Sequence, residues 1–443
     1  MSTAAPAPRP AGQDRLWSVD EHLDDILAAV RPLEPIELQL PDAQGCVLVE
    51  DVTVPVSLPP FDNSSMDGYA VRVADIAGAS EEFPAALDVV GDVAAGHQAG
   101  LLHVGPGQAA RIMTGAPLPS GAETVVPVEW TDGGLGEGPV SGMRARSLAP
   151  EQAGGQVRVY RSAEARAHVR AQGSDVRAGD RALEAGTVLG PPQIALLAAI
   201  GRGSVRVHPR PRVVVMSTGS ELVQPGETLG SGQIYDSNSF ALTAAARDAG
   251  AIAYRVGAVA DDADTLRSTI EDQLVRADLL VTTGGVSVGA YDVVKEALEH
   301  VGDEDEEGAG VDFRRLAMQP GKPQGFGTVG PDHTPLLALP GNPVSSYVSF
   351  ELFVRPAIRT LMGLKDVHRP TTRAKLTADE ALTSPKGRRQ FLRATYAEGA
   401  VRPVGGAGSH LVAALAHADA LIVVPEDTES VEPGADVEVV LLG

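Results

Sequence analysis

The segment TTGGVSVGAYDVV, residues 282–294, indicates the fold of this chain more clearly than any other stretch. It follows the apolar run 278–281 and leads into the helical pattern 293–298, so the predicted order is strand, glycine-rich loop and helix. A strand that passes through a loop into a helix is the repeating unit of an α/β domain with a parallel sheet. We therefore expect such a domain around this segment.

The loop of this segment has the composition of an anion site. Gly284, Gly285 and Gly289 allow backbone N–H groups to approach an anion closely, and the helix N-terminus adds the positive end of its dipole. The loop also ends in a carboxylate, Asp292, which a bare phosphate cradle does not need. A carboxylate beside a bound anion favours a metal ion or proton-transfer chemistry.

Strands and helices alternate on both sides of this segment, over residues 209–363. The expected strands are 212–217, 252–259, 278–283 and 336–339, and the expected helices are 239–249, 262–276, 292–300 and 344–361. This alternation predicts a doubly wound α/β domain with a mostly parallel sheet.

The N-terminal part of the chain carries a different pattern. Residues 1–14 are rich in alanine and proline, which predicts a disordered tail. A helix follows, because Ser18 and Glu21 form a capping-box pattern before an apolar helical face. We assign residues 15–51, together with residues 173–208, to an N-terminal linking subdomain.

Two further parts of the chain have the sequence pattern of short β-strands. Short valine-rich runs between Gly/Pro turns predict an inserted β-rich module at 52–172 and a small C-terminal β-barrel at 364–443. Several domains are expected in a chain of 443 residues, because single hydrophobic cores stop growing at about 250–300 residues.

Composition excludes some classes of function. A net charge of −22 disfavours nucleic acid and anionic membranes as general partners, and any anion site must be locally basic. No apolar run reaches the roughly 20 residues that a membrane helix needs, and the N-terminus lacks the apolar stretch of a secretory signal. The single cysteine, Cys46, favours a reducing compartment. We expect a cytoplasmic protein.

Four motifs follow expected strands of the α/β domain. They are STGSEL at 217–222, VADD at 259–262, the loop of 282–294, and LPGNPVS at 339–345. Ligands of open α/β sheets bind beyond the carboxyl ends of the strands. Three carboxylates that converge there, Glu221, Asp261 and Asp292, would suit a hydrated Mg²⁺ ion.

Structural roles compete with this interpretation. Asp261 or Asp262 could cap the helix that follows, since aspartate is a favoured N-cap residue. Asp292 could complement the dipole of the next helix from its first turn. The sequence leaves these alternatives open.

Several segments carry a family resemblance. They are PPFDNSSMDGYAVR (59–72), RIMTGAPLPSGA (111–122), STGSEL (217–222), GQIYDSNS (232–239), TTGGVSVGAYD (282–292), MQPGKPQGFG (318–327) and LPGNPVSS (339–346). In this order they resemble the molybdopterin molybdenumtransferase family, which includes the gephyrin E domain. The flanks also fit, so the resemblance covers nearly the whole chain.

The resemblance implies a fold, an assembly and a reaction. It implies four subdomains and an elongated homodimer, whose site lies between the α/β domain of one subunit and the β module of the other. The implied substrates are adenylylated molybdopterin and molybdate, the products are molybdenum cofactor and AMP, and the implied ion is Mg²⁺. Further implied partners are the molybdopterin adenylyltransferase and the recipient molybdoenzymes.

The family motifs also imply site residues. The functional acids carried over are Asp67, Asp175, Glu221, Asp261 and Asp292, of which the last three are the candidate metal ligands. The candidate substrate-binding residues are Thr114, Ser217, Thr218, Gly219, Gly284, Gly285, Ser287, Gly289, Pro340, Asn342 and Pro343. Because the substrates are anions that repel one another, we expect Arg315, Lys322 and backbone N–H groups to stabilise charge.

Two positions depart from the family pattern. Arg315 and Gln319 stand where many relatives have lysine. Arginine keeps the charge and changes the geometry, whereas Gln319 loses the charge, which gives Lys322 more weight.

Two other functions are compatible with parts of the chain. A molybdopterin adenylyltransferase would share the α/β domain, although the β module and the C-terminal barrel disfavour it. A non-catalytic scaffold or an inactive paralogue is the third alternative, and it would be expected to lose site acids.

Overall fold

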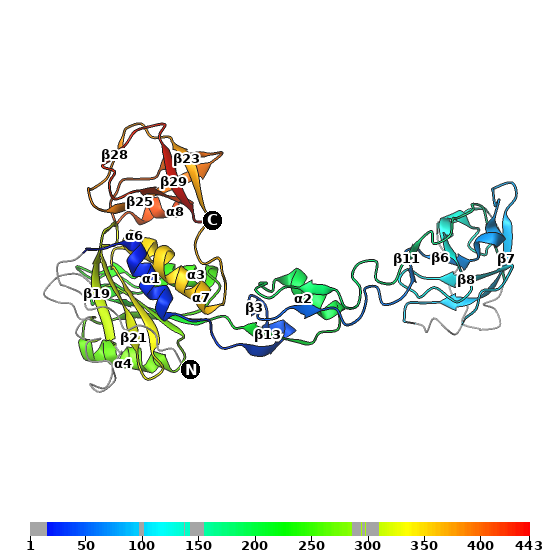
Figure 1. Ribbon diagram of the computed structural model, residues 1–443, viewed down its shortest axis with the longest axis horizontal. Coiled ribbons are helices and arrows are strands. Elements are labelled where there is room, and N and C mark those ends of the chain that lie inside the picture. Colours follow the sequence, from blue (N-terminus) through cyan, green and yellow to red (C-terminus); the bar gives the residue numbers. More distant parts are fainter. Residues whose placement is uncertain are drawn as a thin grey trace.

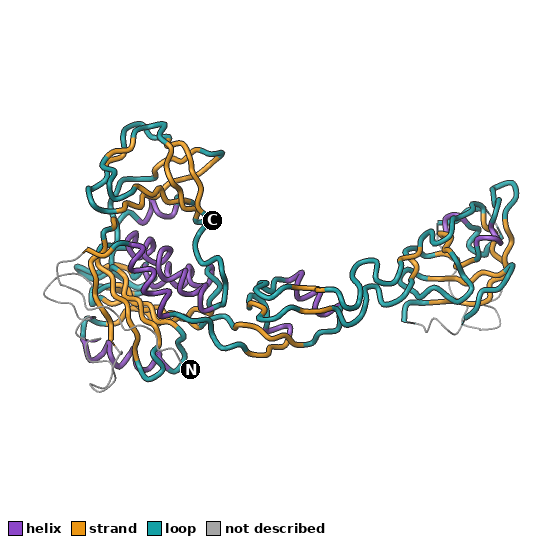
Figure 2. The backbone as a smooth tube through the Cα atoms, in the orientation of Figure 1, coloured by secondary structure: helices purple, strands orange, loops and turns teal. Residues whose placement is uncertain are grey.

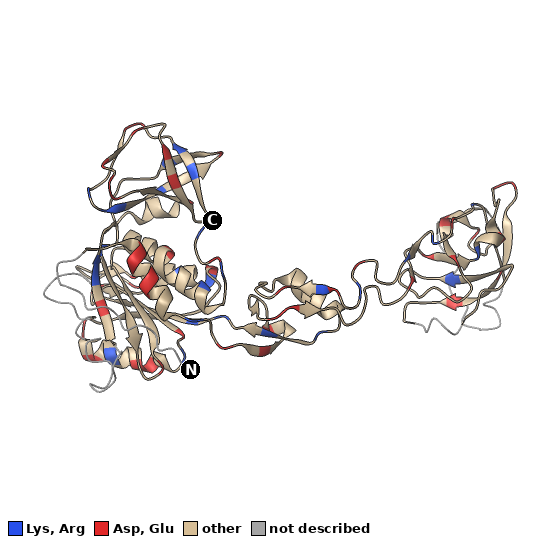
Figure 3. Cartoon of the chain, in the orientation of Figure 1, with Lys and Arg blue, Asp and Glu red and all other residues tan. Residues whose placement is uncertain are grey.

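The computed structural model describes residues 16–96, 102–136, 138–141, 155–285, 294, 297 and 310–443. The predicted tail at 1–14 lies outside the described residues. The molecule is elongated: the α/β domain and the C-terminal domain lie at one end, the β module lies at the other, and the linking subdomain lies between them (Figure 1). Acidic residues occur in each of these parts (Figure 3).

The α/β domain is built on a seven-stranded sheet with the order β1-β19-β21-β22-β18-β14-β17. Its four parallel strands are β22 (Thr334–Leu339), β18 (Leu279–Thr283) and β14 (Arg212–Thr218) inside the sheet and β17 (Ile252–Val259) at one edge. All four strands were predicted. β14, β18 and β22 are almost continuously apolar, as strands covered on both faces must be.

The other edge of this sheet was not predicted. β19 (Gly310–Leu316) and β21 (Pro323–Val329) form an antiparallel pair beside β22, and the short β1 (Leu16–Trp17) runs parallel to β19. β19 contains Asp312, Arg314 and Arg315, so its polar residues hide the alternating pattern of a strand.

Helices cover both faces of the sheet (Figure 2). One face packs against α1 (Val19–Ala29), α3 (Asn238–Asp248), α6 (Pro343–Ser349) and α7 (Arg355–Leu361), and the other packs against α4 (Ala263–Leu274). Successive residues of β14 point to opposite faces, so Val213 and Val215 belong to the first core and Val214 and Met216 to the second.

Two local features differ from or refine the expected helices. A π-helical segment, Phe350–Val354, separates α6 from α7 within the single predicted helix, next to Pro356, which lacks a backbone N–H. The capping box is present: Ser18 N–H donates to Glu21 Oε2 and Glu21 N–H donates to Ser18 Oγ, each at 3.0 Å.

The first helix packs on the α/β domain. Trp17, Val19 and Ile26 belong to the same buried core as the inner strands of the large sheet. Residues 16–30 therefore lie with the α/β domain, whereas the sequence assignment grouped them with the linking subdomain.

The linking subdomain is a small unit with its own core. Its three-stranded sheet contains β2 (Ile36–Gln39), β13 (Ser204–His208) and β3 (Val47–Leu48), and α2 (Pro191–Ala199) packs beside it. Two chain segments connect it to the β module, and they pair where Leu58 N–H donates to Val176 O at 2.8 Å.

The β module contains a five-stranded sheet. Its order is β10 (Gln156–Val159), β7 (Ala85–Val93), β8 (Gln108–Ile112), β6 (Gly68–Val71) and β9 (Thr124–Pro127). The chain enters and leaves this module through the same paired connection, so the module is an insertion within the linking subdomain.

The C-terminal domain is a closed barrel, as predicted. Its strands are β23 (Thr371–Leu376), β25 (Arg389–Ala397), β26 (Ala400–Pro403), β27 (Ala420–Val424) and β29 (Asp436–Leu441), and pairing of β25 with β27 closes the ring. The short β20 (Met318–Gln319) of the α/β domain pairs with β25 and joins the two domains. Among the described residues, no helix is long and apolar enough to cross a bilayer.

Candidate functional site

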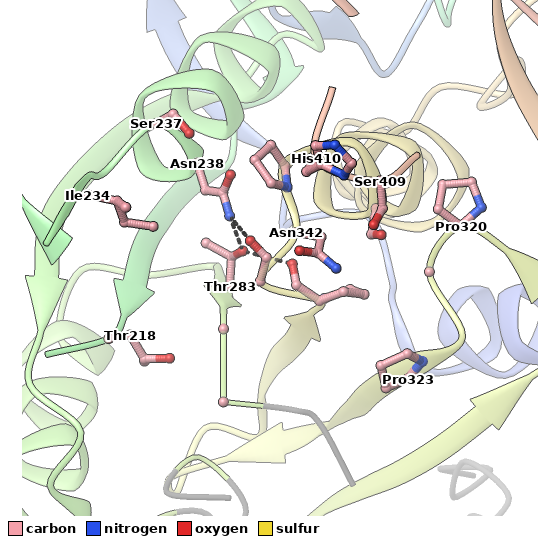
Figure 4. Close-up of a pocket in the computed structure, with 18 of the residues that line it drawn as sticks. Thr218, Ile234, Ser237, Asn238, Thr283, Pro320, Pro323, Asn342, Ser409 and His410 are labelled. Atoms are coloured by element: carbon pink, nitrogen blue, oxygen red, sulfur yellow. Dashed lines mark hydrogen bonds between the residues drawn. The ribbon is translucent and has the colours of Figure 1, made fainter. Parts of the chain in front are cut away.

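A cavity of about 950 Å³ opens at the carboxyl ends of the parallel strands, where the α/β domain meets the C-terminal barrel. Figure 4 shows Thr218 and Ile234 on one side, Pro320 and Pro323 on the other, and Thr283 and Asn342 between them. The predicted site residues that line it are Thr218, Gly219, Glu221, Asp261, Gly284, Gly285, Pro340, Asn342 and Pro343. Four separate loops of the sequence therefore meet at one cavity.

The two described glycines of the loop after β18 are required by close packing. Gly284 has φ +105°, and a Cβ placed on it would lie 2.5 Å from the carbonyl oxygen of Thr218. Gly285 has φ +63°, and its Cβ would lie 2.4 Å from a methyl group of Val294. A side chain at either position would collide with its neighbour, so glycine lets this loop lie against the end of β14.

The structure separates the roles of the adjacent acids after β17. Asp262 caps α4, because its Oδ2 accepts from Thr265 N–H at 2.8 Å and from the Thr265 hydroxyl at 2.5 Å. These hydrogen bonds lower the pKa of the Asp262 carboxyl. Asp261 lines the cavity instead, and its Oδ2 accepts from Ser220 N–H at 3.1 Å. The capping alternative is therefore correct for Asp262.

Glu221 lies beside Asp261 on the same wall. Gly219 allows this position, since a Cβ placed on Gly219 would lie 2.6 Å from Glu221 Oε2. Both carboxylates are exposed at the cavity. Asp292, Ser287 and Gly289 lie outside the described residues. Within the part of the chain that the structure describes, no three His, Cys, Asp or Glu side chains are close enough to hold a metal ion. The three-carboxylate metal site remains a prediction.

A buried aspartate that the sequence analysis did not single out forms the base of the cavity. Asp236 is fully buried, and its Oδ1 accepts from Ser217 Oγ at 2.8 Å and from Ser239 N–H at 3.1 Å. Its Oδ2 accepts from the Ser239 hydroxyl, and Arg255 Nη1 lies 3.9 Å away. Ser217, a predicted binding residue, thus lies beneath the cavity and holds Asp236.

Asn238 connects the ends of two strands across the cavity. Its Nδ2 donates to Gly341 O at 2.7 Å and to Thr283 Oγ1 at 3.1 Å, as drawn in Figure 4. The hydroxyls of Thr283 and Ser346 are 2.8 Å apart. Asp236 and Asn238 belong to the family string GQIYDSNS (232–239), so the polar residues of that string could have predicted a place at the cavity for both.

The C-terminal barrel supplies part of the cavity lining. Arg388 of the C-terminal barrel lines the cavity, together with Ser409 and His410. The predicted residues Lys322 and Arg315 do not line the cavity themselves, although Lys322 stands between Gly321 and Pro323, which do. Burial, and then the charges of Arg315 and Arg388, lower the pKa of Lys322. The barrel is held there by Val344 N–H, which donates to Ser409 O at 3.0 Å. Sequence analysis missed Arg388, Ser409 and His410.

Three predicted site residues lie outside both the α/β domain and the C-terminal barrel. Asp67 and Thr114 form a hydrogen-bonded pair in the β module, next to β6 and β8, at the far end of the molecule (Figure 1). Asp175 is exposed in the paired connection, and its N–H donates to Leu58 O at 3.0 Å. One copy of the chain therefore does not bring these residues to the cavity.

Comparisons with known proteins cover the whole architecture. Residues 17–201 match the MoeA N-terminal region (domain I and II), residues 214–360 match a probable molybdopterin binding domain, and residues 375–442 match the MoeA C-terminal region (domain IV). Together these three matches follow the order of the parts described above.

Individual relatives match over nearly their full length. Molybdopterin molybdenumtransferase 2 of Mycobacterium tuberculosis is 45% identical over 95% of this chain and 98% of that protein. The molybdopterin molybdenumtransferase of Bacillus subtilis is 34% identical over 96% and 94%. A crystal structure of the molybdopterin biosynthesis MoeA protein of Pyrococcus horikoshii is 31% identical, covers 97% of this chain and 100% of that one, and superposes with a TM-score of 0.73. The chain therefore belongs to the molybdopterin molybdenumtransferase family, a group of transferases of molybdenum cofactor biosynthesis.

Proposed function

We propose that this protein inserts molybdenum from molybdate into adenylylated molybdopterin and releases AMP. The observation that carries the proposal is that two carboxylates, Glu221 and Asp261, and a cation, Arg388, line one cavity. The match over nearly the whole chain favours this function over molybdopterin adenylylation, for which we expected a match to the α/β domain alone.

The charge distribution suits the chemistry of the substrates. Molybdate, the dithiolene sulfurs and the phosphoanhydride are all anionic, so they repel one another unless the protein supplies positive charge. We propose that Arg388, which lines the cavity, and the nearby Lys322 and Arg315 hold the oxyanion against the dithiolene. Two Mo–S bonds form to the dithiolene as one oxo group of molybdate takes up two protons and leaves as water. A water molecule cleaves the phosphoanhydride to AMP and a phosphate on molybdopterin.

The acidic part of the lining fits a magnesium ion. Glu221 and Asp261 present exposed carboxylate oxygens, the donors that Mg²⁺ prefers, and we propose Asp292 as a third ligand. A bound Mg²⁺ ion would neutralise the phosphoanhydride oxygens and the two carboxylates together. Asp261 is oriented for this by its hydrogen bond from Ser220 N–H.

A second copy of the chain would complete the site. Asp67 and Thr114 lie at the far end of the molecule from the cavity, so in one chain they are separated from Glu221 and Asp261 (Figure 1). We propose a homodimer in which the β module of one subunit covers the cavity of the other, with Asp175 close to the same junction.

The proposed location is the cytoplasm, which Cys46 supports as the single cysteine of the chain. The molybdopterin adenylyltransferase that makes the substrate and the enzymes that receive the cofactor are the proposed protein partners.

The experiment is to incubate the purified protein with adenylylated molybdopterin and Mg²⁺, with and without molybdate, and to measure AMP. We expect AMP release that depends on molybdate. ATP-dependent adenylylation of molybdopterin would instead identify an adenylyltransferase. No turnover by a correctly folded protein would identify a scaffold or an inactive paralogue.

A further inference from the structure

The first residue of β25 makes an ion pair with the α/β domain that the proposed chemistry leaves unused. Arg389 Nη1 and Nη2 donate to Oδ1 and Oδ2 of Asp20, each at 2.8 Å, and Arg389 Nε donates to Glu426 Oε1 at 3.0 Å. Two parallel hydrogen bonds to one carboxylate fix the plane of a guanidinium group, which a single contact does not. The pair thus joins the barrel to the first turn of α1.

The backbone of Arg389 is fastened at the same place. Its N–H donates to Ala317 O at 2.9 Å, and Ala317 N–H donates to Trp17 O at 2.7 Å. Trp17 directly precedes Ser18, the N-cap residue of α1, and its side chain is buried in the core of the α/β domain. The start of α1 therefore holds the start of β25 twice, through Ala317 and through Asp20 (Figure 1).

Asp20 is itself held in place. It lies within the capping box of Ser18 and Glu21, next to the buried Val19. The hydrogen bonds from Arg389 lower the pKa of the Asp20 carboxyl, so the pair is charged at neutral pH. A competing role exists, because an acid in the first turn stabilises a helix dipole. That role concerns α1 alone and does not require Arg389.

Arg388 is the residue directly before this anchor. It is half-buried and lines the cavity. Within the part of the chain that the structure describes, no carboxylate forms an ion pair with its guanidinium group. The position of this cation therefore depends on where β25 begins. Charge stabilises a bound anion best when it is held in place before the anion arrives.

We infer that Asp20 is a positioning residue for the bound oxyanion: through its ion pair with Arg389, it holds Arg388 at the cavity. This inference rests on the proposed function, because it assumes that Arg388 meets molybdate. Asp20 and Arg389 do not line the cavity, so they act on the substrate only through Arg388. The Asp20 side chain is 66% exposed, so the pair adds little to the stability of the fold and acts on the placement of the barrel.

The test measures AMP release as a function of molybdate concentration. Asp20→Asn removes the charge and keeps the size of the side chain. We expect its KM for molybdate to rise about fivefold and its kcat to stay within about twofold, because the oxyanion is bound less well before and during the reaction. In a protein that already carries Arg388→Ala, Asp20→Asn is expected to change KM by less than about twofold, since residues that act through one group are not additive.

Hydrogen exchange gives a measurement that does not depend on turnover. The N–H of Arg389 donates to Ala317 O, so its exchange reports how firmly β25 is fastened. In Asp20→Asn, peptides that cover residues 386–392 are expected to exchange at least about threefold faster. Peptides that cover β29, on the same barrel, are expected to exchange as in the unmodified protein.

A matched control is an ion pair within the barrel. Arg373 Nε lies 3.0 Å from Asp436 Oδ2, and both side chains are exposed. Asp436 does not line the cavity, so Asp436→Asn is expected to leave the KM for molybdate unchanged. An equal rise of KM in both variants would overturn the inference, as would a rise in Asp20→Asn that adds fully to that of Arg388→Ala. Unchanged exchange at residues 386–392 would do the same.

The outcomes also separate this inference from the proposed function. If the unmodified protein shows molybdate-dependent AMP release and Asp20→Asn keeps its KM for molybdate, only the positioning role is wrong. Asp20 would then serve the dipole of α1 alone, with a lower Tm as its sign. If the unmodified protein shows no molybdate-dependent AMP release, the proposed function fails and the positioning role fails with it.

Discussion

Thr114 donates two hydrogen bonds to one oxygen of Asp67: its N–H lies 2.7 Å and its hydroxyl 2.8 Å from Asp67 Oδ1. The two residues are 47 positions apart in the sequence and come together because β6 and β8 pair in antiparallel order. The pair fixes the carboxylate on the surface of the β module. Its distance from the cavity in one chain makes the proposed shared site testable.

The first prediction concerns that shared site. Asp67→Ala and Glu221→Ala are each expected to abolish turnover as separate proteins. When the two variants are unfolded and refolded together, or co-expressed, about a quarter of the unmodified activity should return. Half of the randomly formed dimers are mixed, and each mixed dimer contains one site with both residues intact. Molybdate-dependent AMP release measures the recovery. A mixture as inactive as its components would refute a site shared between subunits.

A second prediction uses two neighbouring acids as a matched pair. Asp261→Ala removes a cavity carboxylate and is expected to lower kcat/KM at least about 100-fold, with little change in Tm. Asp262→Ala removes the cap of α4 and is expected to lower Tm while turnover is kept. Calorimetry and the AMP assay on both variants provide the comparison. A reversed pattern would show that Asp262, and not Asp261, serves the chemistry.

Glycine packing at the cavity gives a third prediction. Gly284→Ala introduces a Cβ 2.5 Å from the carbonyl oxygen of Thr218. This oxygen belongs to the backbone of β14, so it cannot move aside as the end of a flexible side chain could. Gly399→Ala is the control, because Gly399 has φ +79° and no atom lies within 4 Å of its Cβ position. We expect about 1 kcal/mol of destabilisation for Gly399→Ala and at least about twice that for Gly284→Ala, measured by urea unfolding. Equal losses would mean that the conformation alone, and not the contact, requires glycine.

The fourth prediction concerns pH and a buried histidine. His22 packs against Phe353 with ring centroids 4.8 Å apart, and Arg314 Nη1 lies 3.5 Å from its Nδ1. Burial, and then the charge of Arg314, lower the pKa of His22 to about 3. The folded state therefore keeps the neutral ring, whereas the unfolded chain protonates near pH 6.5. Stability is complete above that pH and falls by about 1.4 kcal/mol per pH unit as the pH drops toward 3.

The measurement is a series of urea unfolding experiments between pH 7 and pH 4.5. His22→Gln cannot titrate, so its stability should fall less steeply than that of the unmodified protein over this range, even if it starts lower. NMR of the folded protein should show a neutral His22 ring at pH 5. Parallel slopes for the two proteins would contradict the lowered pKa.

Sequence patterns predicted the helices and strands that are determined by residues close together in the sequence. The inner strands β14, β18 and β22 could be predicted because strands buried on both faces are almost continuously apolar. The Ser18–Glu21 capping box needs only neighbouring residues. β19 was missed because Arg314 makes its interaction with Asp25, 2.7 Å away, in a helix that lies far from it in the sequence. No local pattern anticipates such a contact.

The site divides in the same way. The motif residues Thr218, Glu221 and Gly284 could be expected at the cavity because each follows a strand of one sheet. Arg388 and His410 could not, since their place depends on how the barrel docks through β20 and Ser409. The sequence also could not show which of Asp261 and Asp262 caps the helix, because both are aspartates and both stand just before it. The coordinates were needed to decide this.

The paired connection between the linking subdomain and the β module means that the module could be removed without disturbing the rest of the chain. The segments that enter and leave the module are adjacent at Leu58 and Val176. A short turn could therefore join these two residues directly in place of the module. Such a shortened protein would keep the cavity and lose Asp67 and Thr114. Supplied with the excised module as a separate polypeptide, it would show whether the two halves of the site need a covalent link at all.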